Sequence, residues 1–166
     1  MSETTSRPTN FQAVANFCRV FGQTTPDTIQ KNIMIDNPKL TQFRISLIEE
    51  EFRELKEAVA QNDMTEVIDA LGDILYVVYG MGVAFGIDLD EAFRIVHESN
   101  MSKLCRTEQD AIDTIEHYKT LPGFENVKVN YRLSPDGKYY VIYNEETGKI
   151  LKSKYFTLPD FTKMMA

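Results

Sequence analysis

The segment RISLIEEEFRELKEAVAQNDMTEVIDALGDILYVVYG, residues 44–80, decides the fold of this chain. It holds two clusters of acidic residues, which form either a solvated helix face or a site for a divalent metal ion. The clusters are Glu49, Glu50, Glu51 and Glu54, followed by Glu66, Asp69 and Asp73. Because the apolar residues of the segment recur at helical spacing, it predicts two helices joined by a turn near Asn62.

Helical periodicity places the acidic residues relative to the apolar faces. The predicted apolar stripes are Ile45, Ile48, Phe52, Leu55 and Val59 on the first helix, and Val67, Leu71, Leu75 and Val78 on the second. Glu51 and Glu54 lie on the flank of the first stripe, and Asp69 and Asp73 lie opposite the second, on a side that becomes apolar farther along. Half-buried carboxylates repel one another and are costly alone, so the pattern favours a bound cation.

An antiparallel hairpin brings together residues that are equidistant from its turn. With the turn near Asn62, Glu51 lies opposite position 73 and Glu54 lies opposite position 70. Glu51, Glu54, Asp69 and Asp73 then meet at one level. Carboxylate oxygens of this kind suit Mg²⁺ or Mn²⁺.

The rest of the chain predicts further helices and a small β region. The additional helices are expected at about 10–21, 88–103 and from about 107 onward. Phe17 and Phe21, on the first of these, fit core packing better than a nucleobase pocket. After residue 123, β-forming residues alternate between two turn sequences, which predicts a meander. We therefore expect a mainly α-helical single domain over 1–166, with a helical core at about 10–121 and a β-rich appendage and tail at about 124–166.

Composition excludes several classes of partner. The net charge of −7 and the pI near 4.9 argue against nucleic acid or an anionic membrane as the main partner. We expect no membrane-spanning segment, and the beginning MSETTSRPTN lacks the pattern of a signal peptide. Cys18 and Cys105 are expected to be buried free thiols in a reducing compartment. These features predict a cytoplasmic protein.

Three stretches carry a resemblance to a known family. LIEEEFREL, DALGDILYVVYG and GIDLDEAFRIVHESNMSKL resemble the all-α nucleoside triphosphate pyrophosphohydrolases, which include MazG-like proteins, dimeric dUTPases and phosphoribosyl-ATP pyrophosphohydrolase-like proteins. The resemblance covers about residues 10–105 and 145–161, where TGKILKSKYFTLPDF looks like a segment that closes over the nucleotide. It implies a four-to-five-helix bundle of this type, assembled as a homodimer or homotetramer. The small C-terminal β-meander, expected from the alternating residues, has no counterpart in the shortest members.

The family's metal motif is EExxE on one helix and ExxD on the next. Glu50, Glu51 and Glu54 match the first half. The second half departs from it, because alignment on Asp73 leaves Ala70 where the family has glutamate. Asp69 with Asp73 is the preferred substitute, and Glu66 with Asp69 is the alternative. The predicted ligands of Mg²⁺, with Mn²⁺ as a substitute, are Glu50, Glu51, Glu54, Asp69 and Asp73.

The resemblance implies cleavage between the α- and β-phosphates of a ribo- or deoxyribonucleoside triphosphate, giving the monophosphate and pyrophosphate. Glu50 is the candidate for orienting or deprotonating the attacking water. Asn100 and Lys103, on one face of their helix, and Lys149 and Lys152, in the tail, are the candidate substrate-binding residues. The alternative is a catalytically weakened nucleotide-binding or subunit-interaction protein of the same fold.

Overall fold

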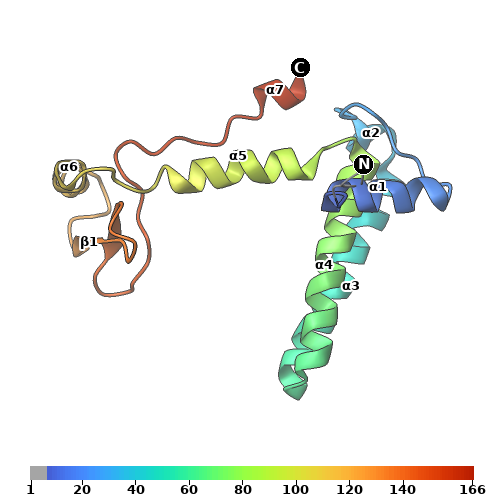
Figure 1. Cartoon of the computed structure of the whole chain (residues 1–166), viewed down its shortest axis with the longest axis horizontal. Coiled ribbons are helices and arrows are strands. Elements are labelled where there is room, and N and C mark those ends of the chain that lie inside the picture. The colour runs from blue at the N-terminus through green and yellow to red at the C-terminus, as the bar shows by residue number, and fades with distance from the viewer. Residues whose placement is uncertain (1–6) are drawn as a thin grey trace, which may run out of the picture. The chain divides into compact units, whose positions relative to one another are not determined.

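The computed structural model describes residues 7–166, so the first six residues of the predicted domain lie outside the described residues. The chain is mainly helical with a small two-stranded antiparallel sheet near its C-terminus, as predicted (Figure 1). It divides into two compact units: the chain up to Ala92 together with Phe161–Ala166, and Phe93–Asp160. Each unit has its own packing and is described by itself.

The first unit is built around a helical hairpin. Its helices are α1 (Asn10–Val20), α2 (Ile33–Asp36), α3 (Pro38–Gln61), α4 (Met64–Phe85) and α7 (Thr162–Met165). α3 and α4 pack along each other, while α1 packs on α4 and α2 on α3. A further helix, α5 (Leu89–Met101), begins in this unit and continues into the second.

Local signals fix both ends of the hairpin helices. Pro38 occupies the first position of α3, and the side chain of Asn37 accepts a hydrogen bond from the Leu40 N–H at 3.2 Å. α3 ends at Asn62, which has a left-handed backbone with a φ of 55°. The Asp63 side chain then caps α4 by accepting bonds from the first backbone N–H groups of that helix. The hairpin turn therefore falls at Asn62, as the sequence predicts.

The core of the first unit lies where α1 packs on α4. Its buried residues are Val14, Ala15, Cys18 and Val83. The apolar stripes of the hairpin are less buried than predicted, because Phe52 on α3 stays 53% exposed and Leu75 on α4 stays 58% exposed. α1 packs through residues near one end of α4, so the stripes toward the turn are left open.

Phe17 and Phe21 also differ from the core packing expected of them. Their rings stack with centroids 4.2 Å apart, and the Tyr76 ring meets Phe17 edge-on at 5.5 Å. Phe17 is 38% exposed and Phe21 is 66% exposed. Val14 and Cys18 take the buried side of α1, which leaves this aromatic group at its margin.

The second unit joins a helix to the sheet. α6 (Glu108–Lys119) packs on β1 (Val129–Leu133) and β2 (Tyr140–Asn144), which pair antiparallel. The core contains Cys105, Ala111, Tyr118 and Ile142. The sequence placed α6 in the helical core, whereas its apolar face meets the strands. The expected third strand is reduced to one bridge, between Tyr143 and Ile150.

Hydroxyl groups hold the tail to the end of α5 within this unit. Ser99 donates to the Thr157 carbonyl at 2.8 Å, and the Thr157 N–H donates to the Ser102 hydroxyl at 2.9 Å. Ser153 donates to the Ser102 carbonyl at 3.0 Å. The first two bonds satisfy backbone groups of the tail, and the third occupies a carbonyl just past the end of α5.

α4 is long and apolar enough to cross a membrane by length and composition, contrary to the expectation that no segment would be. A packed helix of a domain core passes the same test. In the described chain α4 packs against both α1 and α3.

Gly86, which ends α4, is a test of this packing. Its φ is +71°, and a Cβ there would lie 2.1 Å from the Thr28 carbonyl oxygen. Gly86→Ala should lower the free energy of unfolding by about 3 kcal/mol or more, since backbone strain adds to a clash with backbone. Gly22→Ala is the matched control, because Gly22 has a φ of +70° but open space around it; it should cost only about 1 kcal/mol. Urea unfolding followed by circular dichroism measures both, and equal losses would contradict the close approach at Gly86.

Candidate active site

The register of the hairpin decides which side chains of α3 and α4 meet. A Cβ at Gly80 would lie 3.0 Å from Nη1 of Arg44, so these positions face each other. Arg44 and Gly80 lie equally far from Asn62 along the sequence. Glu51 and Asp73 form a second pair that is equally far from Asn62. The observed contact therefore agrees with the register that sets Glu51 against Asp73.

Glu51 is the electrostatic centre of the acidic residues. Burial raises the pKa of its carboxyl above the ordinary value, and the charges of Glu54, Asp73, Glu50 and Asp69 raise that pKa further, in that order. The other four predicted metal ligands therefore act on Glu51 from two helices. The structure brings them close enough for mutual repulsion to be felt at Glu51.

The Oε2 atom of Glu51 is buried and has no hydrogen-bond partner. A buried carboxylate oxygen without a partner costs free energy, and here other carboxylates add to the cost. An all-oxygen set of this kind suits a hard divalent cation such as Mg²⁺ or Mn²⁺. The residues present therefore fit such a cation in their chemistry.

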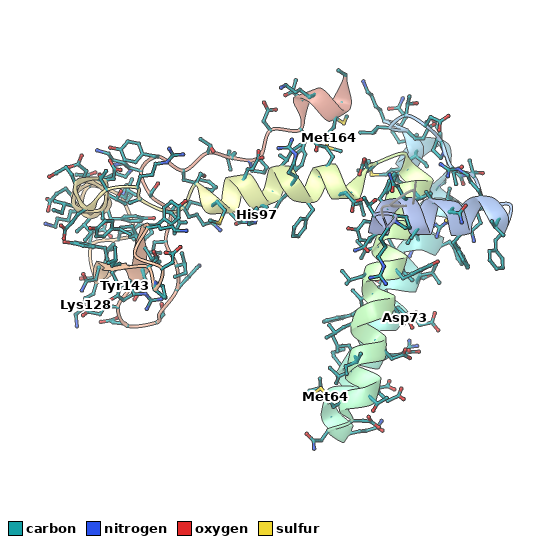
Figure 2. All side chains as sticks on the ribbon, viewed as in Figure 1. Met64, Asp73, His97, Lys128, Tyr143 and Met164 are labelled. Carbon is teal, nitrogen blue, oxygen red and sulfur yellow. The ribbon has the colours of Figure 1, made fainter. Side chains whose placement is uncertain are left out.

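The side chains as they stand do not form a closed cage. Across residues 7–166, no group of three or more His, Cys, Asp or Glu side chains is arranged to hold a metal ion. Repulsion between like charges favours such spreading. Figure 2 shows Asp73 projecting from one side of the hairpin and Met64 from the other.

The two alternatives for the second half of the motif differ in position. Asp73 and Asp69 both raise the pKa of Glu51. Glu66 lines a cavity of about 500 Å³ near the turn, together with Glu54 and Asp69. The effect on Glu51 supports pairing Asp69 with Asp73, and the cavity keeps Glu66 as the alternative.

The four candidate substrate-binding residues belong to the second unit. Lys103 donates a hydrogen bond from Nζ to Oδ1 of Asn100 at 2.6 Å. Nζ of Lys152 lies 4.3 Å from the centre of the Phe156 ring. The Lys149 carbonyl accepts the Asn144 N–H at 2.9 Å, which places Lys149 just after a turn. Their contacts with a nucleotide stay a prediction.

Sequence reasoning did not single out Arg44, the other unusual residue of the hairpin. Its side chain is 7% exposed, and its Nε is buried without a hydrogen-bond partner. Nη2 donates to Oε1 of Gln23 at 2.9 Å. The available signal was spacing, because Arg44 precedes Glu51 by two helical turns and so shares its face of α3.

Comparison with known proteins agrees with this geometry. The phosphoribosyl-ATP pyrophosphohydrolase family matches residues 14–100, which include both halves of the carboxylate cluster. The fold and this match define a member of the all-α nucleoside triphosphate pyrophosphohydrolase class. The chain belongs to the phosphoribosyl-ATP pyrophosphohydrolase family, and its function is of the nucleotide pyrophosphohydrolase type. It is also similar to "Uncharacterized protein L479" of Acanthamoeba polyphaga mimivirus, with 39% identity over 96% of each chain.

The raised pKa of Glu51 predicts a pH-dependent cost of folding. The folded state binds the proton of this carboxyl more tightly than the unfolded state does, so the cost is full above the raised pKa. It is relieved as the pH falls from that raised value toward the ordinary 4.5. In chelator at pH 7, Glu51→Gln should therefore raise the melting temperature, and this gain should disappear near pH 4.5.

The control for this measurement is Glu49→Gln, an exposed residue of the same acidic run. It should leave the melting temperature nearly unchanged at both pH values. Excess Mg²⁺ should stabilise the wild type more than Glu51→Gln. A lower melting temperature for Glu51→Gln in chelator at pH 7 would contradict the assigned repulsion.

Proposed function

We propose that the protein hydrolyses ribo- or deoxyribonucleoside triphosphates between the α- and β-phosphates, releasing a monophosphate and pyrophosphate. The observation that supports this most is the buried, unpartnered Oε2 of Glu51, surrounded by four further carboxylates on α3 and α4. These helices lie within the residues that match the pyrophosphohydrolase family. In this proposal Glu50, Glu51, Glu54, Asp69 and Asp73 hold Mg²⁺, with Mn²⁺ as a substitute.

Each residue of the cluster has a role that follows from its position. A divalent cation held there would neutralise phosphate charge and lower the pKa of water. Glu51 offers an oxygen with no competing partner, and Glu54, Asp69 and Asp73 add charge from both helices. Glu50 is exposed at the edge of the cluster, so it can orient the attacking water and accept its proton. Pyrophosphate leaves as the new bond to the α-phosphorus forms.

Asn100, Lys103, Lys149 and Lys152 are the proposed contacts to the nucleotide. Asn100 and Lys103 are already hydrogen-bonded to each other, which restricts both side chains. Together they offer an amide and a charge to sugar and phosphate oxygens. Lys149 and Lys152 would add charge to the phosphates from the tail.

A catalytically weakened nucleotide-binding protein is the second candidate. The observation that favours it is Ala70, which stands where the family's second motif has glutamate. A panel of ribo- and deoxyribonucleoside triphosphates, assayed for pyrophosphate release with Mg²⁺ or Mn²⁺, separates the two. Turnover of any of them supports the enzyme, whereas saturable binding without turnover supports the binder.

The variants that test the enzyme lie in the carboxylate cluster. Glu54→Gln should lower kcat at least 100-fold with the fold intact, because a ligand charge is lost while size is kept. Asp69→Ala should lose most activity and Glu66→Ala little, because Mg²⁺ tolerates only small displacements of its ligands. Glu49→Gln is the control, since this exposed residue of α3 is not among the predicted ligands and does not line the cavity near the turn. Greater damage from Glu66→Ala than from Asp69→Ala would shift the site toward the turn.

A second copy of this chain is the proposed cover for the open apolar stripes of α3 and α4. Phe52, Leu71 and Leu75 are each about half exposed in the chain alone. Apolar patches of this kind mark association surfaces, and a homodimer or homotetramer would bury them by a symmetric interface.

Sedimentation of the wild type should therefore show a dimer or tetramer. Leu71→Glu should shift the population toward monomer, because it places a charge in the stripe. Arg53→Glu, an exposed position of α3, should leave the assembly unchanged. A wild type that stays monomeric at tens of micromolar would reject the proposed interface.

A further inference from the structure

Arg44 is a buried cation that the proposed chemistry does not yet use. Its side chain is 7% exposed, and among residues 7–166 no carboxylate forms an ion pair with it. Nε has no hydrogen-bond partner at all, whereas Nη2 bonds to the neutral Oε1 of Gln23 at 2.9 Å. A guanidinium has five N–H donors and keeps its charge in proteins. One buried donor of Arg44, Nε, is therefore unsatisfied, and no described carboxylate neutralises its charge.

The surroundings of Arg44 hold the guanidinium in place. Gly80 lies beside it on α4, where a Cβ would come within 3.0 Å of Nη1. The Phe43 ring centre lies 5.9 Å from Cζ. Gly80 leaves room that any larger residue would fill, and Gln23 fixes one edge of the fork. The side chain is thus positioned by Gly80 on α4, Phe43 on α3 and Gln23 after α1.

A cavity lies about one helical turn beyond this position, on the side away from Glu51, and Arg44 is not among its lining residues. Its volume is about 460 Å³, and its lining includes Thr24, Leu40 and Ala84. Thr24 follows Gln23 in the chain, Leu40 lies one helical turn before Arg44, and Ala84 lies one turn after Gly80. Space for a ligand therefore lies one layer of the hairpin away from the guanidinium.

Arg44 and Glu51 carry opposite charges on one face of α3. They are the residues of the described chain whose buried side-chain polar atoms lack partners. Their separation of seven residues corresponds to about 10 Å along the helix axis. A cation beside Glu51 and an anion beside Arg44 would satisfy both, and a nucleotide phosphate with its divalent cation supplies both charges at once.

We infer that Arg44 binds a phosphoryl group of the nucleotide. Its guanidinium is hydrogen-bonded to Gln23 and occupies the room that Gly80 leaves. This inference rests on the proposed function. The phosphoryl group is either part of the released pyrophosphate or the α-phosphate that stays with the monophosphate. Planar N–H pairs of arginine match phosphate oxygens in a bidentate manner, so a lysine should replace it poorly.

The test is isothermal titration of the full chain in Mg²⁺ with inorganic pyrophosphate, and separately with uridine and adenosine monophosphate. Arg44→Gln should weaken binding of one of the two phosphate classes roughly 10- to 100-fold, as expected for lost hydrogen bonds to a charged group. Arg44→Lys should recover only part of this loss. Arg53→Gln, which removes an exposed arginine of the same helix, should leave both affinities unchanged.

Gly80→Ala keeps the test decisive if Arg44→Gln does not fold. The added methyl group displaces Nη1 by a few tenths of an ångström and favours the helix, so the variant should fold and bind phosphate several-fold more weakly. Loss of pyrophosphate affinity assigns Arg44 to the leaving group. Equal loss for both monophosphates assigns it to the α-phosphate.

Two results would overturn the inference. Unchanged affinities in folded Arg44 variants would make the residue structural, and a loss confined to one base would make it a reader of the base. The proposed function fails separately. If no triphosphate is hydrolysed but pyrophosphate binding still depends on Arg44, the phosphate site stands without the enzyme. If hydrolysis proceeds and the Arg44 variants bind both ligands normally, only this inference falls.

Discussion

The position of one left-handed residue, Asn62, governs the chemistry of the hairpin. Because α3 ends there and Asp63 begins α4 at once, every later pairing between the two helices follows from the distance to this turn. One residue inserted into the first turns of α4 would rotate the helix beyond it by about 100° against α3. Asp73 would then leave the neighbourhood of Glu51, and Gly80 would no longer make room for Arg44.

Two residues of the hairpin, Glu51 and Arg44, have buried polar atoms in unfavourable surroundings. Glu51 is crowded by like charges, and Arg44 has no opposite charge beside it. Each arrangement costs folding free energy in the isolated chain. Residues kept at such a cost are typical of functional sites. The core where α1 packs on α4 is separate from both and supplies apolar packing that offsets them.

Much of the hairpin could be read from the sequence because its signals are local. Asn37 and Pro38 mark the start of α3, Asp63 caps α4 and Gly86 ends it. Periodicity also placed Glu51 opposite Asp73. Periodicity does not show which surface packs on an apolar stripe. Phe52 and Leu75 were therefore expected to be buried, whereas in this chain alone both are exposed.

Packing between segments that are far apart in the sequence could not be predicted for the same reason. The apolar face of α6 is equally suited to helices or strands, and only the fold shows that Ala111 and Tyr118 meet Ile142. Arg44 was overlooked because a charged residue in a helix ordinarily lies in solvent. Its spacing from Glu51 carried the information, but the unpaired Nε became visible only with its neighbours in place.

The boundary within α5 has a consequence for how this chain can change over time. The family match ends at residue 100, and the unit that begins at Phe93 has its own core and its own hydroxyl links from Ser99 and Ser102 to the tail. Substitutions in α6 or the strands are therefore absorbed by contacts among themselves. Such substitutions are expected to leave the Asn62 turn, and with it the register of the hairpin, unchanged.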